Sequence, residues 1–474
     1  MTLTEILADI CLAEDAENIS DNAYRAAEKL LLDSLGCAMA AHDAPGIQAV
    51  TDQVIEWGGK NEASLFLSSE TAPAPNAAFV NSAMIHALDY DDVHIPGLIH
   101  ITSIVVPAML ATGEMAGASG KNALAAMITG IEVAARLAMA ETRRRRSAGF
   151  LPSSLAGGFG GVATAARLLG LNREQTVNAL GINYAQAAGN RQALLDLTLT
   201  KRLQPAFAVR SAIWSVALAR RGVTGPEKSL EGEAGYFKLF MNGEIPAAEE
   251  FLTDREQKEV ERVALKRYPS CGGCHHVQIA AERLAVREKL GPEKIARVEL
   301  FGCGPGGLVG NPFRLGSNPQ VAAQFSAAWA AAFALLRGKA KLADYTNRAV
   351  TEDKQVVDLA GRITYTAVPD DVPRASEMPA DYPKGHDSPH GLILHTTDGR
   401  RLTACQYPFE TFAPGNMSFE ETVEKFKDCA EFSGICATAK AMDIVNLVSG
   451  FCAEENVKRI SNTLAGEALP QSGN

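Results

Sequence analysis

The chain has 474 residues, 47% of them hydrophobic, and a mean hydropathy near zero, so it can bury a large core and divide into about two domains. Its net charge of −10 repels phosphate backbones, which argues against nucleic acid or an anionic membrane as a partner. Nine cysteines, thinly spread and odd in number, do not make a disulfide framework, so we expect reduced thiols.

The N-terminal segment and the apolar stretches bear on the compartment. Acidic residues stand where a signal peptide needs basic ones. No stretch approaches the roughly 20 uninterrupted apolar residues of a membrane span. We therefore expect a cytoplasmic protein with no membrane partner.

Up to about residue 265 the sequence predicts helices almost throughout, because apolar positions recur three and four residues apart. Thr102 or Ser103 can cap one of these helices, with Pro107 in its first turn and a stop at residues 118–120. Two apolar stripes each need a helical partner. They run through Tyr24, Ala27, Leu31, Leu35 and Ala38, and through Leu124, Met127, Ile128, Ile131, Ala135 and Ala138.

After about residue 265 the sequence mixes helices with strand-like runs at 297–301, 362–365 and 391–395, and the proline-rich stretch 368–389 is predicted to be an exposed loop. A helical pattern returns at Ser418, where Ser418 and Glu421 supply a capping box. We therefore expect a mostly α protein. Its helical domain would comprise residues 1–265 and 415–453, an α+β domain would span 266–414, and a tail without an apolar face, 454–474, would be frayed.

The densest polar cluster lies between residues 86 and 100, where three histidines and three carboxylates precede an expected helix N-terminus. A helix N-terminus favours an anionic ligand, and histidine beside carboxylate suits general acid and base catalysis. A metal site is the competing functional interpretation, although the spacing matches no strong ligand pattern. Capping and surface salt bridges are the structural alternative.

Three further groups are candidates. The segment from Cys271 to His276 matches the C-x-x-C-H of haem attachment and half of a zinc site, but the expected compartment and the lack of a second C-x-x-C argue against both. His275 or His276 could instead act at a helix opening. Lys201 lies at a loop-to-helix junction, where a lysine can face a cavity or stay in solvent. The arginine run 143–146 suits carboxylate capture or complements a helix C-terminus.

In this order the motifs resemble the MmgE/PrpD family, which includes 2-methylcitrate dehydratase, cis-aconitate decarboxylase and iminodisuccinate epimerase. The resemblance covers about residues 4–451. The motifs that carry it are His86-Ala-Leu-Asp-Tyr-Asp-Asp92 with His100, Lys201-Arg-Leu203, Thr224-Gly-Pro226, Leu230-Glu-Gly232, Lys266-Arg-Tyr-Pro269 with His275, Ala323-Gln-Phe-Ser326, and Lys425-Phe426.

The resemblance implies a large all-helical domain formed by both chain ends, an inserted α+β lid domain, a homodimer, and catalysis without metal or organic cofactor. By motif, the catalytic residues would be Asp89, His100, Lys201 and His275. Lys201 and His275 would transfer protons, and His100, oriented by Asp89, would protonate the leaving group or hold a carboxylate. The expected substrate-binding residues are His86, Tyr90, Arg143, Arg191, Lys266 and Ser270.

Two departures bear on the reaction. Decarboxylase relatives have a threonine where this chain has Val93, and a histidine where it has Leu151, whose side chain cannot transfer a proton. We therefore expect a 2-methylcitrate dehydratase-like hydro-lyase acting on a small di- or tricarboxylic acid. An epimerase of a dicarboxylate, then a decarboxylase, remain alternatives, and an inactive carboxylate-binding homologue is the non-enzyme alternative.

Overall fold

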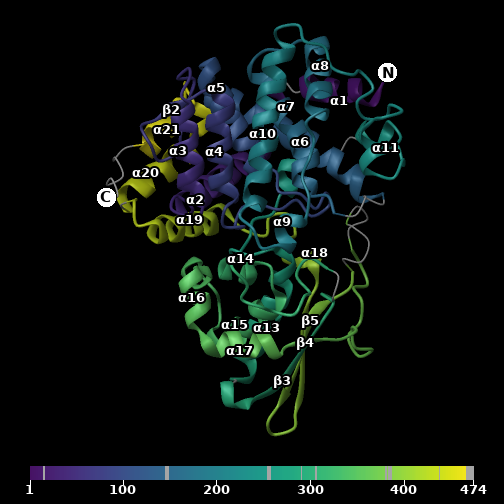
Figure 1. Ribbon diagram of the computed structural model, residues 1–474, viewed down its shortest axis with the longest axis vertical. Coiled ribbons are helices and arrows are strands. Elements are labelled where there is room, and N and C mark those ends of the chain that lie inside the picture. The colour runs from purple at the N-terminus through teal and green to yellow at the C-terminus, as the bar shows by residue number, and fades with distance from the viewer. Residues whose placement is uncertain are drawn as a thin grey trace. The chain divides into compact units, whose positions relative to one another are not determined.

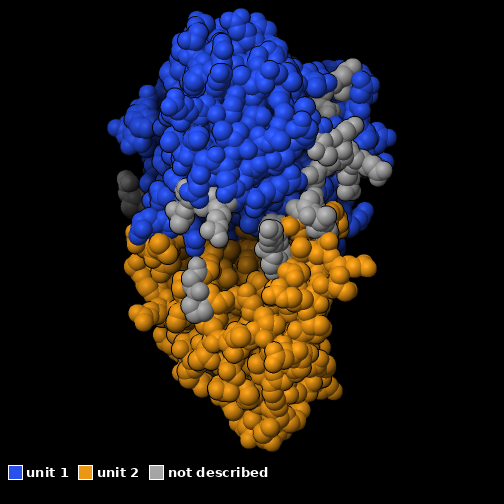
Figure 2. All heavy atoms as spheres, turned by 90° about the vertical axis from the view of Figure 1, so that its right-hand side faces the viewer, with its two compact units in different colours: residues 1–193, 199–265, 417–474 blue, residues 194–198, 266–416 orange. Residues whose placement is uncertain are grey.

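The structure is a computed structural model, which describes residues 1–13, 16–144, 149–252, 258–289, 291–304, 307–378, 382, 387–436 and 438–465. It is mostly helical (Figure 1). Two compact units divide the chain, and Figure 2 colours them separately. Unit 1 comprises Met1–Ala193, Leu199–Leu265 and Met417–Asn474, and unit 2 comprises Leu194–Thr198 and Lys266–Asn416.

Unit 1 is built from helices whose apolar stripes face one another. Both predicted stripes are buried, and α10 lies against α4 and α7, with α5 and α6 also packed on α7 (Figure 1). Its main helices are α1 (Leu3–Ala13), α2 (Asp21–Ala40), α3 (Ile47–Trp57), α4 (Ala74–His86), α5 (Thr102–Ala116), α6 (Gly120–Thr142), α7 (Pro152–Leu168), α8 (Arg173–Tyr184), α10 (Thr200–Ala219), α19 (Phe419–Ser433), α20 (Thr438–Ser449) and α21 (Lys458–Ala465).

Helix α6 meets the length and composition criteria for a membrane span, although Glu132 and Arg136 interrupt its apolar residues. In the window that meets them, 94% of the residues are buried inside the protein. The small residue Gly130 explains part of this packing, because its position faces the carbonyl of Gly160 on α7 at a distance that leaves no room for a side chain. The apolar character of α6 is therefore that of a core helix.

Three local expectations in unit 1 differ from the structure. Residues Ala63–Ser64 (β1) pair antiparallel with Thr71–Ala72 (β2), in a region that we expected to be helical; two-residue strands are too short for alternation to reveal. Pro107 lies inside α5, beyond its first turn, because the helix begins at Thr102. The expected frayed tail contains α21, which buries Ile460 and Leu464; residues 466–474 lie outside the described part.

Unit 2 contains a four-stranded sheet in the order β4-β3-β5-β6. Figure 1 labels β3, β4 and β5 of this sheet. Strands β3 (Ile295–Phe301) and β5 (His390–Thr396) match two predicted runs, whereas β4 is only Thr364–Tyr365 and β6 (Arg401–Gln406) was not predicted. β3 pairs parallel with β4 and antiparallel with β5, and β5 and β6 form a hairpin. Helix α13 (Gly272–Glu288) packs on β5 and β6, and α15 (Ala327–Arg337) packs on α13.

The core of unit 2 lies around these helices. Trp329 of α15 is buried against Phe333 and Tyr345, with ring centroids 5.0 and 4.6 Å apart. Unit 2 also contains the short helices α14 (Pro319–Gln324), α16 (Asn347–Glu352), α17 (Lys354–Arg362) and α18 (Pro408–Thr411). Much of the predicted proline-rich loop, including residues 379–381 and 383–386, lies outside the described part.

Candidate functional site

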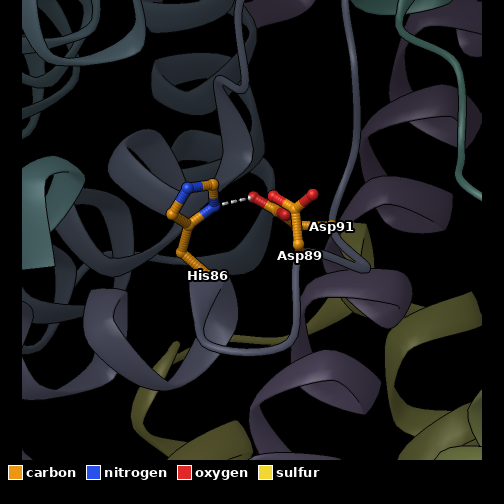
Figure 3. A group of neighbouring side chains, drawn as sticks. All are labelled: His86, Asp89 and Asp91. Atoms are coloured by element: carbon orange, nitrogen blue, oxygen red, sulfur yellow. Dashed lines mark hydrogen bonds and ion pairs between the residues drawn. The ribbon is translucent and has the colours of Figure 1, made fainter. Parts of the chain in front are cut away.

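The candidate site in unit 1 begins where α4 ends. His86 is the last residue of α4, and three residues later Asp89 adopts the left-handed conformation, with φ of 52°. A non-glycine residue in that region costs about 1 kcal/mol or more, although aspartate tolerates it better than most. The turn brings the carboxylates of Asp89 and Asp91 beside the His86 ring (Figure 3).

Lys201 joins this group from the first turn of α10. Its Nζ lies 2.8 Å from Nε2 of His86 and bonds directly to the carboxylate of Asp89. On the other side of the ring, Nδ1 of His86 lies 2.7 Å from the Asp91 carboxylate. We call these four residues the Lys201 cluster. All are buried except Lys201, whose side chain is 12% exposed.

The contacts define the protonation of His86. An ammonium can only donate, so Nε2 of His86 accepts from Lys201, and Nδ1 carries the proton that is donated to Asp91. Burial lowers the pKa of His86; the Asp91 carboxylate opposes this effect and the Lys201 charge reinforces it. His86 is therefore a neutral bridge between an acid and a cation.

The same geometry bears on the metal alternative. Ligand atoms of His86, Asp89 and Asp91 lie within 4.8 Å of one another, close enough to surround a cation. Lys201 already bonds to two of these residues, so its ammonium supplies the positive charge in the cluster. A metal ion there would have to displace Lys201.

His100 lies near the cluster, with its ring centroid 5.2 Å from that of His86. We expected Asp89 to orient it, but Nδ1 of His100 lies 2.6 Å from the carbonyl oxygen of Asp92. A carbonyl only accepts, so Nδ1 carries a proton, and the lone pair lies on Nε2 whenever the ring is neutral. The backbone of Asp92, rather than the side chain of Asp89, orients His100.

Asp92 also caps α5, a role that we had expected of Thr102 or Ser103. Its carboxylate accepts from the backbone N–H groups of Ile101 (3.1 Å) and Thr102 (3.0 Å), and from the Thr102 hydroxyl (2.5 Å). Burial raises the pKa of Asp92 to about 7, and the neighbouring Asp91 adds to this rise. The N-terminus of α5 is thus capped by the Asp92 carboxylate of this protein.

His94, the third histidine of the predicted cluster, has a structural environment. Nε2 of its ring lies 2.9 Å from the Glu259 carboxylate, and Nδ1 accepts from the N–H of Gly97 at 3.2 Å. Glu259 also binds Arg262, and both histidine and glutamate are fully buried. The histidines of this segment therefore divide into two near Lys201 and one in a separate ion-pair network.

Other predicted site residues of unit 1 have different partners. Tyr90 is buried with its ring against Lys425, whose Nζ lies 3.8 Å from the ring centroid. Arg143 and the adjacent Arg144 pair with Glu250, while Arg145 and Arg146 lie outside the described residues. Arg191 is half-buried, and its N–H donates to the carbonyl of Gly149 at 2.7 Å.

The remaining predicted residues lie in unit 2. His275 is fully buried on α13, with its ring centroid 5.0 Å from that of Tyr268 and 5.2 Å from that of Phe412. His276 is also buried, and its Nδ1 lies 2.9 Å from the hydroxyl of Thr411. The two other predicted substrate-binding residues, Lys266 and Ser270, are completely buried.

Three charged residues around the Lys201 cluster were not predicted as site residues, although two of them, Arg202 and Lys425, belong to the motifs that carry the resemblance. Asp33 and Lys425 form a buried ion pair at 2.6 Å. Arg202 is buried next to Lys201; burial lowers its pKa to about 10, the Asp89 carboxylate opposes that effect, and its guanidinium donates to the carbonyl of Pro45. An available signal was the position of Asp33 in the apolar run Leu30-Leu-Leu-Asp-Ser-Leu35, since a charge there needs a buried partner.

Two family models match consecutive parts of the chain, and the second extends beyond unit 2 into residues 417–449 of unit 1. A family model described as the MmgE/PrpD N-terminal domain matches residues 5–249, and one described as the MmgE/PrpD C-terminal domain matches residues 268–449.

Three curated relatives are 26–28% identical to this chain. Cis-aconitate decarboxylase of Aspergillus terreus is 28% identical over 312 residues, which cover 62% of this chain and 62% of that protein. Cis-aconitate decarboxylase-like protein oryM of Aspergillus oryzae is 27% identical over 281 residues, 56% of this chain and 58% of that protein. The cis-aconitate decarboxylase of Mus musculus is 26% identical over 298 residues, 61% and 59% of the two chains. The matches thus span about three fifths of these relatives.

Proposed function

The chain belongs to the MmgE/PrpD family, and from this premise we propose that it is a lyase that removes a proton from the carbon next to a carboxylate of a small di- or tricarboxylic acid. The observation that carries the proposal is the Lys201 cluster, in which one partly buried ammonium contacts both a neutral histidine and a carboxylate. Such groups supply the cation and the proton carriers that this chemistry needs. The decarboxylases among the relatives support lyase chemistry.

The contacts favour a particular assignment of the proton donor and acceptor. His100 has its proton on Nδ1, directed at a backbone carbonyl, so Nε2 is the lone pair that takes the substrate proton. Lys201 is held by two acceptors as an ammonium, so it stabilises the enolate-like charge and then donates a proton to the leaving group. The roles inferred from sequence were different: Lys201 and His275 would transfer protons, and His100 would protonate the leaving group or hold a carboxylate.

We propose elimination of water as the reaction. The proton on the carbon next to the carboxylate goes to His100, the C–H electron pair forms the double bond, and the hydroxyl on the neighbouring carbon leaves with a proton from Lys201. Leu151 supports this choice, since decarboxylase relatives have a histidine there and a leucine cannot carry a proton. The names of the relatives favour decarboxylation as a second candidate.

Proton NMR in deuterium oxide tests the proposal. The purified protein is incubated with citrate, 2-methylcitrate, the aconitate isomers, itaconate and iminodisuccinate, each in turn. We expect deuterium incorporation or formation of an unsaturated acid from one of them, and a loss of about 1,000-fold or more in rate for Lys201→Met. Lys228→Met is the matched control, because Lys228 is an exposed lysine of the same unit.

The possible results separate the alternatives. Release of carbon dioxide identifies a decarboxylase, and exchange with inversion but without elimination identifies an epimerase. If an acid binds without exchange, and Lys201→Met behaves as the wild type does, the chain is a carboxylate-binding protein and the proposed lyase activity is wrong.

We also propose a homodimer, which the α10 surface supports. Phe207 and Trp214 are 43% and 52% exposed, and the guanidinium of Arg210 lies 5.8 Å from the centroid of the Phe207 ring. These residues lie three, four and seven positions apart on one helix face, and aromatic and arginine side chains are enriched in interfaces. Light scattering after size exclusion would detect the dimer, and Trp214→Glu should weaken it.

A further inference from the structure

A second buried lysine lies behind the turn that carries Asp89 and Asp91. Nζ of Lys425, on α19, donates to the carbonyl oxygen of Tyr90 at 2.8 Å and lies 3.8 Å from the centroid of the Tyr90 ring. The same ammonium pairs with Asp33 of α2 at 2.6 Å. Lys425, Tyr90 and Asp33 are all buried, so a single cation holds both the backbone and the side chain of Tyr90.

Tyr90 occupies the position between the two acids of the Lys201 cluster. Asp89 contacts Lys201, Asp91 contacts His86, and Tyr90 between them contacts Lys425. The backbone of Asp89 is in the left-handed region, a conformation that persists only when its surroundings hold it. The hydrogen bond from Lys425 to the carbonyl oxygen of Tyr90, the residue after Asp89, supplies such a restraint.

Simple packing does not account for a charge at this position. A buried ion pair is costly to desolvate, and apolar residues of similar volume often replace such a pair without loss of stability. Burial raises the pKa of Asp33, the Lys425 ammonium opposes that rise, and the carboxylate of Asp91 adds to it. What an apolar side chain would lack here is the hydrogen bond to the Tyr90 carbonyl.

We propose that Lys425, held by Asp33, is a positioning residue that fixes the turn at residues 89–91, so that Asp89 and Asp91 keep Lys201 and His86 in the geometry needed for proton transfer. The role rests on the proposed function, because it acts through the Lys201 cluster. Lys425 itself contacts neither reacting atom nor substrate in this role.

The test compares three variants. Lys425→Met removes the hydrogen bond and the charge. Asp33→Leu with Lys425→Met replaces the whole ion pair by apolar side chains, so the protein keeps its fold even where the single variant does not. Lys427→Met is the matched control, since Lys427 lies on the same helix but is 38% exposed and pairs with Glu424 at the surface.

The kinetic readout uses the acid that exchanges fastest with the wild type. We expect the double variant to unfold at nearly the wild-type temperature and to lose about 100-fold in kcat, with KM changed less than about threefold, because a misplacement of about 1 Å has that effect on a reacting group. Its pH profile should shift, while Lys427→Met keeps the wild-type profile. A stable double variant with wild-type kcat and pH profile would overturn the proposal.

A second readout does not depend on activity. In protein labelled with ¹⁵N-histidine, with the His86 signals assigned from His86→Gln, the wild type should show one neutral tautomer protonated at Nδ1. The double variant should show a changed tautomer population. If no acid exchanges with the wild type, the proposed function fails, and the tautomer decides alone: an altered population supports positioning by Lys425, and unchanged His86 signals refute it.

Discussion

His86 and His275 both lie near an end of a long helix, yet their surroundings differ in kind. His86, in unit 1, bonds through Nδ1 to Asp91 and through Nε2 to a lysine ammonium. His275, in unit 2, packs against the rings of Tyr268 and Phe412. The first ring is thus placed by charged partners and the second by aromatic ones.

This difference shows that neighbours from elsewhere in the chain set the chemistry of a histidine. The partner of His86 on Nε2 lies 115 residues away, and that of His94 on Nε2 lies 165 residues away. His86 and His94 are only eight positions apart, yet one contacts a lysine and the other a glutamate. The comparison predicts that the acids around His86 make the free energy of unfolding depend on pH. It also predicts that an apolar ring in place of His275 changes the free energy of unfolding little.

The largest expected effect concerns the acids near His86. Because burial raises the pKa of Asp92 from 3.8 to about 7, the folded state binds a proton more tightly than the unfolded state. The stability contributed by protonated Asp92 is fully present below about pH 4 and is lost as the pH rises through about 7. The shift corresponds to about 4 kcal/mol.

Unfolding by urea at a series of pH values measures this effect. Asp92→Asn keeps an oxygen that can accept from the N–H of Thr102 but cannot titrate. Between pH 4 and 8 the free energy of unfolding should therefore fall more for the wild type than for the variant. Parallel curves for the two proteins would show that Asp92 does not titrate in this range.

The next effect tests His275. The proposed elimination gives its two proton transfers to His100 and Lys201, but the resemblance to the family also implies a proton-transfer role for His275. On that ground we expect His275→Phe to lower the rate of proton exchange about 100-fold, because a phenyl ring carries no proton. Since the neighbouring rings already provide an aromatic environment, the free energy of unfolding should change by less than about 2 kcal/mol. Exchange rates and chemical unfolding of the same preparations measure both quantities.

His276→Gln is the control for this experiment. His276 bonds to Thr411, so its replacement should affect stability at least as much as His275→Phe does, with little change in rate. If His275→Phe exchanges at the wild-type rate, the proton-transfer role implied by the resemblance is wrong, and the aromatic surroundings of His275 are purely structural.

Sequence patterns predicted much of this fold because they report local physics. Helical periodicity found the buried stripes of α2 and α6, and the capping box at Ser418 is present. The polar residues of the sequence also indicated residues 86–100 and Lys201 as site candidates. The structure places Nζ of Lys201 at 2.8 Å from Nε2 of His86. Periodicity tells which face of a helix is buried, but it does not tell which residue lies opposite.

Local patterns do not specify contacts between distant residues, and this explains the features that we did not predict. The ion pair between Asp33 and Lys425 joins residues 392 positions apart, and no local pattern specifies such a pairing. Arg143 and Arg144, the described part of the arginine run, pair with Glu250, which lies more than 100 residues later. Asp92 lay in a run that we interpreted as catalytic, while its side chain caps α5, because the intervening loop folds back onto that helix.

The smallest expected effect concerns the start of α19, the helix that carries Lys425. Ser418 accepts from the N–H of Glu421 at 3.2 Å, and Glu421 accepts from the N–H of Ser418 at 2.8 Å. Ser418→Ala should lower the free energy of unfolding by about 1 kcal/mol, the usual effect of losing such a cap. The exchange rate should stay unchanged, because Lys425 lies in the second turn and keeps its bonds to Asp33 and Tyr90. A slower rate in fully folded Ser418→Ala would show that the first turn of α19 also positions Lys425, which would extend the restraint on the turn at Asp89 to the beginning of this helix.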